Sequence, residues 1–426
     1  MKKVLFGSTA LATAGLVAAS PALAEGGIKL GLGGYMNNFF GAGDVDQDGN
    51  DFSETGMFSD GEVWFTGETT LDNGISFGAN IQLESFSSGD QIDENFGYME
   101  GGFGRVQFGS ENTAAYLMQF SAPNVGVPLN SGWVTSFVPA PTGFAASFRT
   151  PALSTFIDTG NDENTLTYFT PRLFGFQLGL SYQAALAFSG EGKNSPVQAD
   201  EDTEYRHGIS VGLNFVESFG GVDVSVAGGY RRAEAPDDDI TVIDPRLGAT
   251  TNGAAIKTRT IGLDDMQQVS GGINIGFGGL VIGGSVAAEI DGRVTPTTTA
   301  FTRTDFGGAT LGAARTPAGV FASRITTIAA ATYTSSAESS EGWSYDAGIS
   351  YSTGPWSFGG TYLHGEIEGD VLNGDEDVLD AVEAGVEYAV GPGITTSLSG
   401  LYANWDGESG ADNYGFAGIA GINFRF

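Results

Sequence analysis

The chain has 426 residues, a formal net charge of −33, 67 glycines and no cysteine. So acidic a chain would repel nucleic acid, and its stability cannot come from disulfide bonds. The glycines, together with 30 Phe, 14 Tyr and 5 Trp residues, favour many strands joined by tight turns over a helical protein.

Residues 1–24 have the pattern of a secretory signal peptide. Two lysines precede an apolar run of small residues, and "ALA" at Ala22–Ala24 fits a cleavage site. We therefore expect the mature chain to begin at Glu25 and to form one domain over residues 25–426. A membrane-spanning helix is the alternative, but the apolar run is shorter than the ~20 residues that such a helix needs.

Apolar residues alternate with small or polar residues along most of the remaining chain, which is the period of a β-strand. In the last segment, Tyr414, Phe416 and Ile422 fall on one face, whereas Asn413 and Asn423 fall on the other. The alternation predicts sixteen strands, near residues 27–38, 58–70, 75–86, 93–101, 105–110, 164–172, 176–187, 204–217, 222–233, 264–277, 280–290, 342–353, 356–366, 378–390, 394–404 and 413–426.

The links between these strands alternate in length. Short turns that contain glycine are predicted at 71–74, 103–104, 173–175, 218–221, 278–279, 354–355 and 391–393. The longer links include 39–57, 111–163, 188–203, 234–263, 291–341 and 405–412. Tight turns at one end and long loops at the other are typical of an outer-membrane barrel, with the turns in the periplasm. The sequence thus predicts an all-β fold, a transmembrane antiparallel β-barrel. A soluble sandwich is the alternative, but its polar face would be unusually poor in Lys and Glu.

Several segments resemble the trimeric general porins of Gram-negative bacteria. "ETTLDNGISFGANIQLES" resembles two strands around a periplasmic turn, and "DENFGYMEGGFGRVQFGSEN" resembles the next hairpin. "NTLTYFTPRLFGFQLGLSYQ" matches the family pattern of a Tyr, a Pro and a Gly-Phe turn before an aromatic strand. The C-terminal Phe426, which closes "GINFRF", resembles the terminal aromatic signal that the outer-membrane insertion machinery reads.

The resemblance implies a sixteen-stranded barrel that assembles as a homotrimer among outer-membrane lipids. It also implies that the loop after the fifth strand, residues 111–163, folds into the lumen and constricts the pore. We place Asn130 in this constriction, together with Asp158, Asp162 and Glu163. Because residues 114–148 of the loop contain no acidic residue, an eyelet of loop carboxylates facing an arginine ladder is not well supported.

The sequence contains no recognisable catalytic motif. The two histidines are His207 and His364, and no G-x-S-x-G, histidine metal motif or P-loop occurs. His207 falls on the apolar face of its predicted strand, which favours a contact with lipid or with another subunit. We therefore expect a protein that is not an enzyme and that requires no cofactor.

Strand alternation assigns thirteen charged side chains to the inward face of the barrel. The bases are Lys29, Arg105, Arg206, Arg231 and Arg425, and the acids are Glu62, Glu68, Glu84, Asp223, Glu289, Asp346, Glu383 and Glu387. An excess of acids in a low-dielectric pore concentrates cations, although individual charges can pair and have no effect. The sequence predicts mild cation selectivity, and Trp64 is the one aromatic residue that we place in the lumen.

The stretch "DVDQDGNDFSET", which starts at Asp44, begins like a calcium-binding EF-hand loop. Thr55 stands where the EF-hand has a bidentate Glu, and the flanking segments are strands, so the stretch is not an EF-hand. The candidate calcium ligands are Asp44, Asp46, Asp48 and Glu54, in the first external loop. A solvated acidic loop without calcium is the alternative.

These observations predict an outer-membrane channel for the passive diffusion of small hydrophilic solutes and ions. A substrate-specific channel of the same architecture, for sugars or phosphate, is one alternative. Stacked aromatic residues in the lumen would favour the sugar channel, and a basic ladder would favour the phosphate channel. A surface β-protein without a channel is the other alternative, but it would have no reason to end in Phe426.

Overall fold

The structure is a computed structural model that describes residues 27–46, 54–85, 92–141, 144, 153–157, 163–186, 205–236, 240–243, 258–261, 263–292, 294–301, 331–370, 376–407 and 412–426. The predicted signal peptide lies outside these residues. Apart from strands, they contain one short helix, α1 (Ala114–Leu117), and two 3-10 helices, η1 (Leu129–Ser131) and η2 (Trp133–Ser136). None of the described helices is long and apolar enough to cross a membrane.

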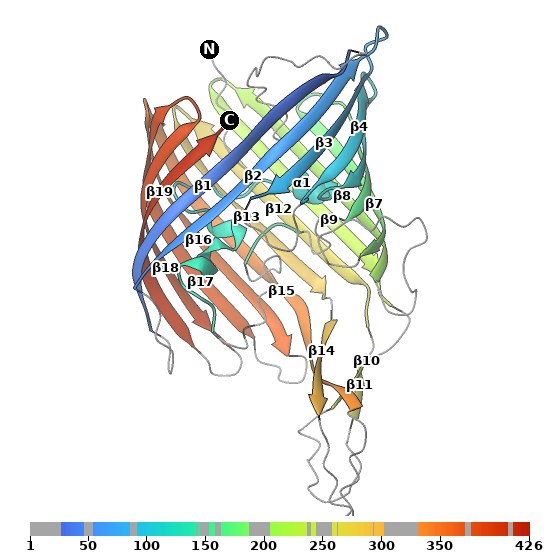
Figure 1. Ribbon diagram of the computed structural model, residues 1–426, viewed down its shortest axis with the longest axis vertical. Coiled ribbons are helices and arrows are strands. Elements are labelled where there is room, and N and C mark those ends of the chain that lie inside the picture. The colour runs from blue at the N-terminus through green and yellow to red at the C-terminus, as the bar shows by residue number, and fades with distance from the viewer. Residues whose placement is uncertain are drawn as a thin grey trace, which may run out of the picture.

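The described strands form one sheet, which closes on itself through the pairing of β1 with β19 (Figure 1). Sixteen antiparallel strands make the closed barrel, as predicted from the alternation. They are β1 (Lys29–Asp46), β2 (Thr55–Thr70), β3 (Ser76–Glu84), β4 (Asn95–Gly101), β5 (Gly104–Ser110), β6 (Asn164–Phe169), β7 (Phe176–Leu186), β8 (Tyr205–Phe219), β9 (Val222–Glu234), β12 (Met266–Phe277), β13 (Leu280–Asp291), β15 (Ala331–Thr353), β16 (Trp356–Asp370), β17 (Asp377–Gly391), β18 (Ile394–Asp406) and β19 (Asn413–Arg425).

Three further strands extend the sheet beyond the barrel. β14 (Val294–Phe301) pairs with the first part of β15, and β10 (Ile240–Ile243) pairs with β11 (Thr258–Ile261). Figure 1 shows them at the end opposite the C-terminus. Strands therefore occupy residues 294–301 and 331–341 of the predicted link over 291–341, whereas residues 302–330 lie outside the described part.

The first external link is also shorter than predicted. β1 continues from Phe39 to Asp46, and β2 already begins at Thr55. The extension is held on both sides, because Ala42 pairs with Thr55 and Asp46 pairs with Tyr414. Glycine and aspartate are rare in strands, which is why this segment resembled a loop, but two complete ladders outweigh that preference.

The outer face of the barrel is apolar. Phe416, Leu398 and Phe108 are 59%, 62% and 66% exposed, respectively, and each alternates with a buried neighbour. Water would make such a continuous apolar face costly, whereas lipid would not. The inner face carries the polar groups, so the alternation separates a membrane-facing wall from a lumen.

The C-terminal residue Phe426 lies beside β1. Phe426 donates a backbone hydrogen bond to Gly34 and accepts one from it, at distances of 3.1 and 2.9 Å. The predicted short turns lie at this same end of the barrel (Figure 1). The start of β1 and the C-terminus therefore lie at one end of the barrel, as an even number of strands requires.

Candidate functional site

Residues 111–141 follow the inner wall of the barrel rather than projecting away from it. At the start of this segment, which we call the inner loop, the backbone N–H of Ala114 donates to Ser181 Oγ at 2.8 Å. The N–H of Ala115 donates to Ser210 Oγ at 3.0 Å. Both serines are buried, inward-facing residues of β7 and β8, so α1 lies inside the ring of strands, where Figure 1 shows it.

The middle of the inner loop is held by the next strands around the barrel. Asn274 Nδ2 on β12 donates to the carbonyl oxygen of Ser121 at 2.9 Å. Thr361 Oγ1 on β16 donates to the carbonyl oxygen of Pro123 at 2.8 Å. These bonds satisfy loop carbonyls that a regular helix or strand would otherwise have to pair.

The far end of the inner loop packs against β16 to β19 and β1. Trp405 Nε1 on β18 donates to the carbonyl oxygen of Val138 at 3.1 Å. Around this bond lies an apolar cluster inside the barrel, formed by Phe39, Val127, Leu129, Val134, Val138, Leu153, Leu363, Leu379, Ala381, Leu401, Ala403, Trp405, Ala417 and Ile419. The inward face of these strands is therefore not a polar pore lining, which the alternation alone did not reveal.

Inward-facing glycines on the barrel wall let the inner loop approach the strands closely, because they have no side chain in its path. A Cβ at Gly272 would overlap with the carbonyl oxygen of Phe120, and a Cβ at Gly348 would lie 2.5 Å from that of Pro123. The glycines that the loop approaches in this way are Gly179, Gly212, Gly229, Gly272, Gly348, Gly359 and Gly385. The sequence showed them only as part of a high glycine content, because their shared role depends on the path of a distant loop.

Asp346 is the strongest single link between the inner loop and the wall. Its carboxylate accepts hydrogen bonds from the backbone N–H of Ala122 at 3.1 Å and from Asn130 Nδ2 at 3.0 Å. It also accepts bonds from the N–H and hydroxyl of Ser285 on β13. Several donors around one buried carboxylate are what a charge removed from water requires, so Asp346 fastens the loop rather than facing permeating ions.

Of the four predicted constriction residues, the structure describes Asn130 and Glu163. Asn130 lies in the inner loop, where it also bonds Thr155 through both its amide nitrogen and its amide oxygen, each at 2.7 Å. Glu163 is buried, and its carbonyl oxygen accepts a bond from Thr165 Oγ1. Asp158 and Asp162 lie outside the described residues. Whether the loop sets the width of a conducting pore stays a prediction.

Five of the thirteen predicted lining charges are removed from water. These are Glu62, Arg231, Glu289, Asp346 and Glu383. Gln183 accepts a bond from Arg231 at 2.7 Å, and Glu289 accepts one from Gln268 at the same distance. The expectation that these five line an open lumen is wrong, because less than a tenth of each residue is exposed.

Arg206 is displaced from its predicted face by a β-bulge. The register of β8 against β9 shifts between Arg206 and Ile209. As a result Tyr205 is buried with Leu186 in an inward cluster. Arg206 lies opposite Glu234 in the strand register, on the other face of the sheet. Alternation counted through the bulge gave the wrong side, because one extra residue reverses every face beyond it.

The remaining inward charges keep contact with water. Lys29, Glu68, Asp223 and Arg425 are exposed, and Glu84, Arg105 and Glu387 are partly exposed. Arg105 lies 3.9 Å above the ring of Tyr98 and 3.7 Å from Glu100. Tyr98 in turn donates to Glu68 Oε2 at 2.5 Å. Two of these inward charges, Arg105 and Glu68, thus interact with other side chains of the barrel wall.

Among the described residues, Trp64 has one aromatic neighbour in the lumen. Its ring lies 6.1 Å from that of Tyr35, measured between centroids. Tyr35 pairs with Glu62 in the β1–β2 register, so both rings belong to the inward face. A pair of rings gives a local platform rather than a continuous track along the pore.

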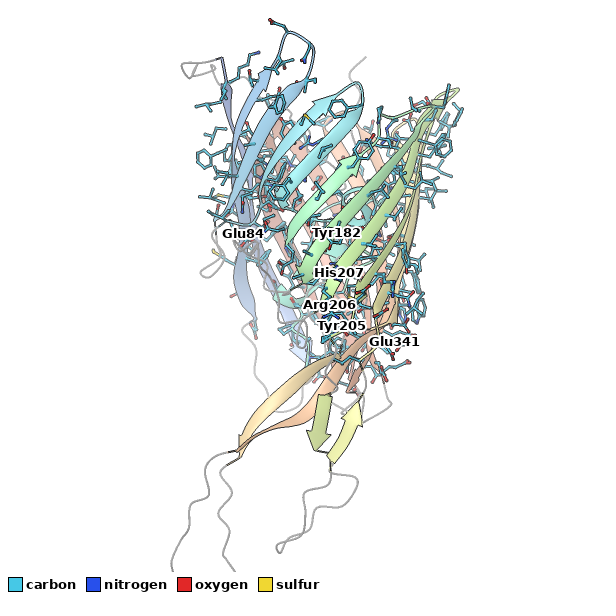
Figure 2. The ribbon with its side chains drawn as sticks, turned by 90° about the vertical axis from the view of Figure 1, so that its right-hand side faces the viewer. Glu84, Tyr182, Tyr205, Arg206, His207 and Glu341 are labelled. Carbon is cyan, nitrogen blue, oxygen red and sulfur yellow. The ribbon has the colours of Figure 1, made fainter. Side chains whose placement is uncertain are left out.

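Both histidines belong to the outer wall. His207, in the bulge of β8, has a φ of 51° and lies 2.9 Å from the hydroxyl of Tyr182 (Figure 2). His364 Nδ1 lies 2.9 Å from Asp380 Oδ1. His364 and Asp380 pair across β16 and β17 on the face that also carries Tyr345. Neither histidine is near the inner loop.

Two of the candidate calcium ligands, Asp44 and Asp46, lie in a strand rather than in a loop. Asp44 and Asp46 are exposed residues of β1, and Asp46 Oδ2 accepts a bond from the Tyr414 hydroxyl at 2.7 Å. The expectation that these two lie in the first external loop is wrong, because the β1–β19 ladder extends to them. Glu54 precedes β2, and Asp48 lies outside the described residues. Calcium binding there stays a prediction.

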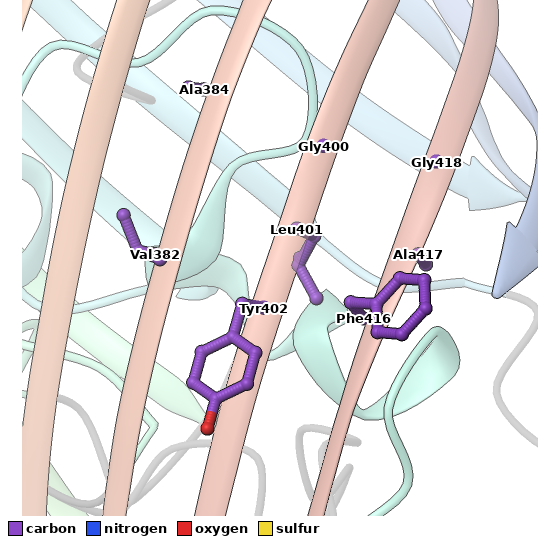
Figure 3. Close-up of a pocket in the computed structure, with 8 residues that line it drawn as sticks. All are labelled: Val382, Ala384, Gly400, Leu401, Tyr402, Phe416, Ala417 and Gly418. Atoms are coloured by element: carbon purple, nitrogen blue, oxygen red, sulfur yellow. The ribbon is translucent and has the colours of Figure 1, made fainter. Parts of the chain in front are cut away.

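A shallow apolar groove on β17–β19 is separate from the lumen. Gly400 and Gly418, which pair across β18 and β19, form part of its floor beside the exposed side chains of Tyr402 and Phe416 (Figure 3). The two glycines alternate with Leu401 and Ala417, which are buried on the inner side. The groove therefore faces the membrane side of the wall.

A model of the Gram-negative porin family matches residues 7–408 of the chain. A search of curated proteins found no match. A porin structure refined at 1.8 Å covers 93% of this chain and all of its own, with a TM-score of 0.50 and 16% identity. The trimer form of OmpT, an outer-membrane protein of Vibrio cholerae, covers 94% of this chain and 100% of its own, with a TM-score of 0.51 and 12% identity.

An anion-selective porin from Comamonas acidovorans has the same fold. It covers 94% of this chain and 99% of its own, with a TM-score of 0.52 and 15% identity. At such identities the likeness concerns the fold alone. It shows that a barrel of this architecture can be anion-selective.

Proposed function

The chain belongs to the Gram-negative porin family, and we propose that it forms a water-filled channel for the passive diffusion of small hydrophilic solutes and ions. Members of this family are outer-membrane channel proteins rather than enzymes. The observation that supports the proposal most is that inward charges such as Glu68 and Asp223 remain exposed inside a barrel whose outside is apolar.

The test is liposome swelling with the purified full-length protein and a series of sugars and amino acids of increasing size. A passive channel admits solutes in order of size, with little regard to chemistry. A sugar-specific channel would show saturation by one solute class, and the Trp64–Tyr35 ring pair is the feature that supports that alternative. No swelling with any small solute would contradict both versions.

The proposed ion preference is a mild selectivity for cations. The inward charges that keep contact with water are the acids Glu68, Glu84, Asp223 and Glu387 and the bases Lys29, Arg105 and Arg425. This excess of acids is small, but the chain as a whole carries a net charge of −33. Acidic lining concentrates cations in the pore. A reversal potential measured in a KCl gradient gives the sign directly.

The proposed assembly is a homotrimer in the outer membrane. The V. cholerae structure, described as a trimer form, supports it, and so does the continuous apolar outer wall of this chain. Light scattering on the detergent-solubilised protein should give a mass three times that of the chain, and a monomer mass would contradict the assembly without touching the channel proposal.

A further inference from the structure

Three carboxylates converge on the inner side of the barrel where β2 meets the β3–β4 link. Carboxylate oxygens of Glu62, Asp93 and Glu94 all lie within 4.8 Å of one another. Glu62 belongs to β2, whereas Asp93 and Glu94 directly precede β4. The backbone fixes this arrangement, because Gln82 on β3 exchanges hydrogen bonds with Asp93 and Glu94 at 3.1 and 2.8 Å.

The cluster is largely removed from water. Glu62 is 8% exposed and Glu94 is 9% exposed. Like charges in such surroundings repel one another more strongly than they would in water. The arrangement therefore needs a positive charge or bound protons to compensate it.

A neighbouring side chain outside the acidic cluster has an amide oxygen without a donor among the described residues. Asn112 is 7% exposed, and its amide nitrogen lies 3.5 Å from Glu94 Oε1. Asn112 Oδ1 and Glu62 Oε1 have no hydrogen-bond partner among the described residues. A half-turn of the Asn112 amide would place its oxygen toward Glu94, so a fourth oxygen ligand is within reach.

We propose that Glu62, Asp93 and Glu94 bind a divalent cation, with calcium favoured over magnesium and with Asn112 as an additional oxygen ligand. Calcium binds oxygens at about 2.3–2.6 Å, so two of its ligands can be up to about 5 Å apart. Magnesium binds at about 2.0–2.1 Å and allows only about 4 Å. The separations within the cluster do not exceed 4.8 Å, and three protein carboxylates around one centre favour calcium, because magnesium is usually held by only one or two.

The cation links three parts of the barrel. It joins β2 to the β3–β4 link, and through Asn112 it reaches the first residues of the inner loop. Three carboxylates with one amide resemble weak extracellular calcium sites, so the expected dissociation constant is on the order of 10⁻⁴ M. The bound ion stabilises the root of the inner loop, since anything that binds only the folded state raises its stability.

The test is the thermal unfolding of the detergent-solubilised full-length protein in EDTA, in calcium and in magnesium. Millimolar calcium should raise the Tm of the wild type more than magnesium does. Glu62→Gln should abolish most of this rise, and in EDTA it should melt above the wild type because one of three like charges is gone. Asp93→Asn, outside any strand, serves as a second variant in case Glu62→Gln does not fold.

The double variant Asp72→Asn, Glu217→Gln is the matched control, because it removes two exposed acids at the short-turn rim of the barrel. It should keep the full calcium response. Terbium provides a second readout, since Trp64 lies two residues from Glu62 on the same face and should excite a bound ion that calcium displaces. An unchanged wild-type Tm in calcium, or a response lost in the rim variant but kept in Glu62→Gln, would overturn the proposal.

Discussion

Asn130 Nδ2 lies 3.0 Å from Asp346 Oδ2, a hydrogen bond that joins the middle of the inner loop to β15 across 216 positions of sequence. The same Asn130 amide also bonds Thr155 in both directions. One side chain therefore holds two parts of the loop and the wall together. The role of Asn130 is therefore structural.

Replacing Asn130 with Ala should lower stability and loosen the inner loop. The change removes three hydrogen bonds, each worth about 1 kcal/mol, so unfolding should become easier by roughly 2–3 kcal/mol. Thermal unfolding measures the loss, and noise in single-channel recordings measures the loosening. Asn124→Ala in the same loop is the control, and equal effects from both variants would contradict the special role of Asn130.

Gly272 and Gly271 are adjacent on β12 but face opposite sides. A Cβ at Gly272 would overlap with the Phe120 carbonyl, whereas at Gly271 the nearest atom is the Ala227 carbonyl oxygen at 3.6 Å. Gly272→Ala should therefore cost roughly 1–3 kcal/mol, as overpacking does, and should change the single-channel conductance. Gly271→Ala should do neither. If the two variants behave alike, the inner loop does not rest on Gly272.

Glu84 and Glu289 are both inward acids, but only Glu84 keeps contact with water. Glu289 is 1% exposed and accepts bonds from Gln268 and Ser340. Glu84→Gln should shift the reversal potential toward anions, most clearly at low salt, where the screening length is about 10 Å at 0.1 M. Glu289→Gln should leave it unchanged. A larger shift from Glu289→Gln would refute the assignment of which acids face the pore.

Glu111, at the root of the inner loop, should make stability depend on pH. Burial raises the pKa of Glu111 from its usual 4.5 to about 7. The folded chain then holds this proton more tightly than the unfolded chain, so stability should fall as pH rises from about 4.5 to about 7. Tm measured across this window should lose part of its slope in Glu111→Gln. An unchanged slope would show that other groups cause it.

Most of the barrel could be predicted from the sequence because its determinants are local. Period-two alternation and glycine turns placed the strand from Val222 to Glu234 within one residue. The errors arise where long-range pairing decides. The extension of β1 to Asp46 depends on β19, and the side of Arg206 depends on a bulge in its pairing with β9.

The lumen was less predictable than the wall. Alternation identified Asp346 and Glu383 as inward, but only the path of the inner loop decides that both are covered. The same is true of Trp405. Its inward ring would not be expected in a polar pore lining, and the contact that explains it is the hydrogen bond to the Val138 carbonyl oxygen. Residues that are far apart in sequence meet there, so no local pattern could indicate the contact.

Single-channel recording of the purified protein in a planar bilayer tests whether a water-filled pore runs through the barrel. The account predicts stepwise conductance that rises in proportion to the conductivity of the bathing KCl solution. Closure in three equal substeps would match the proposed trimer. Stable incorporation of folded protein without any conductance steps would contradict the claim that this barrel is an open channel.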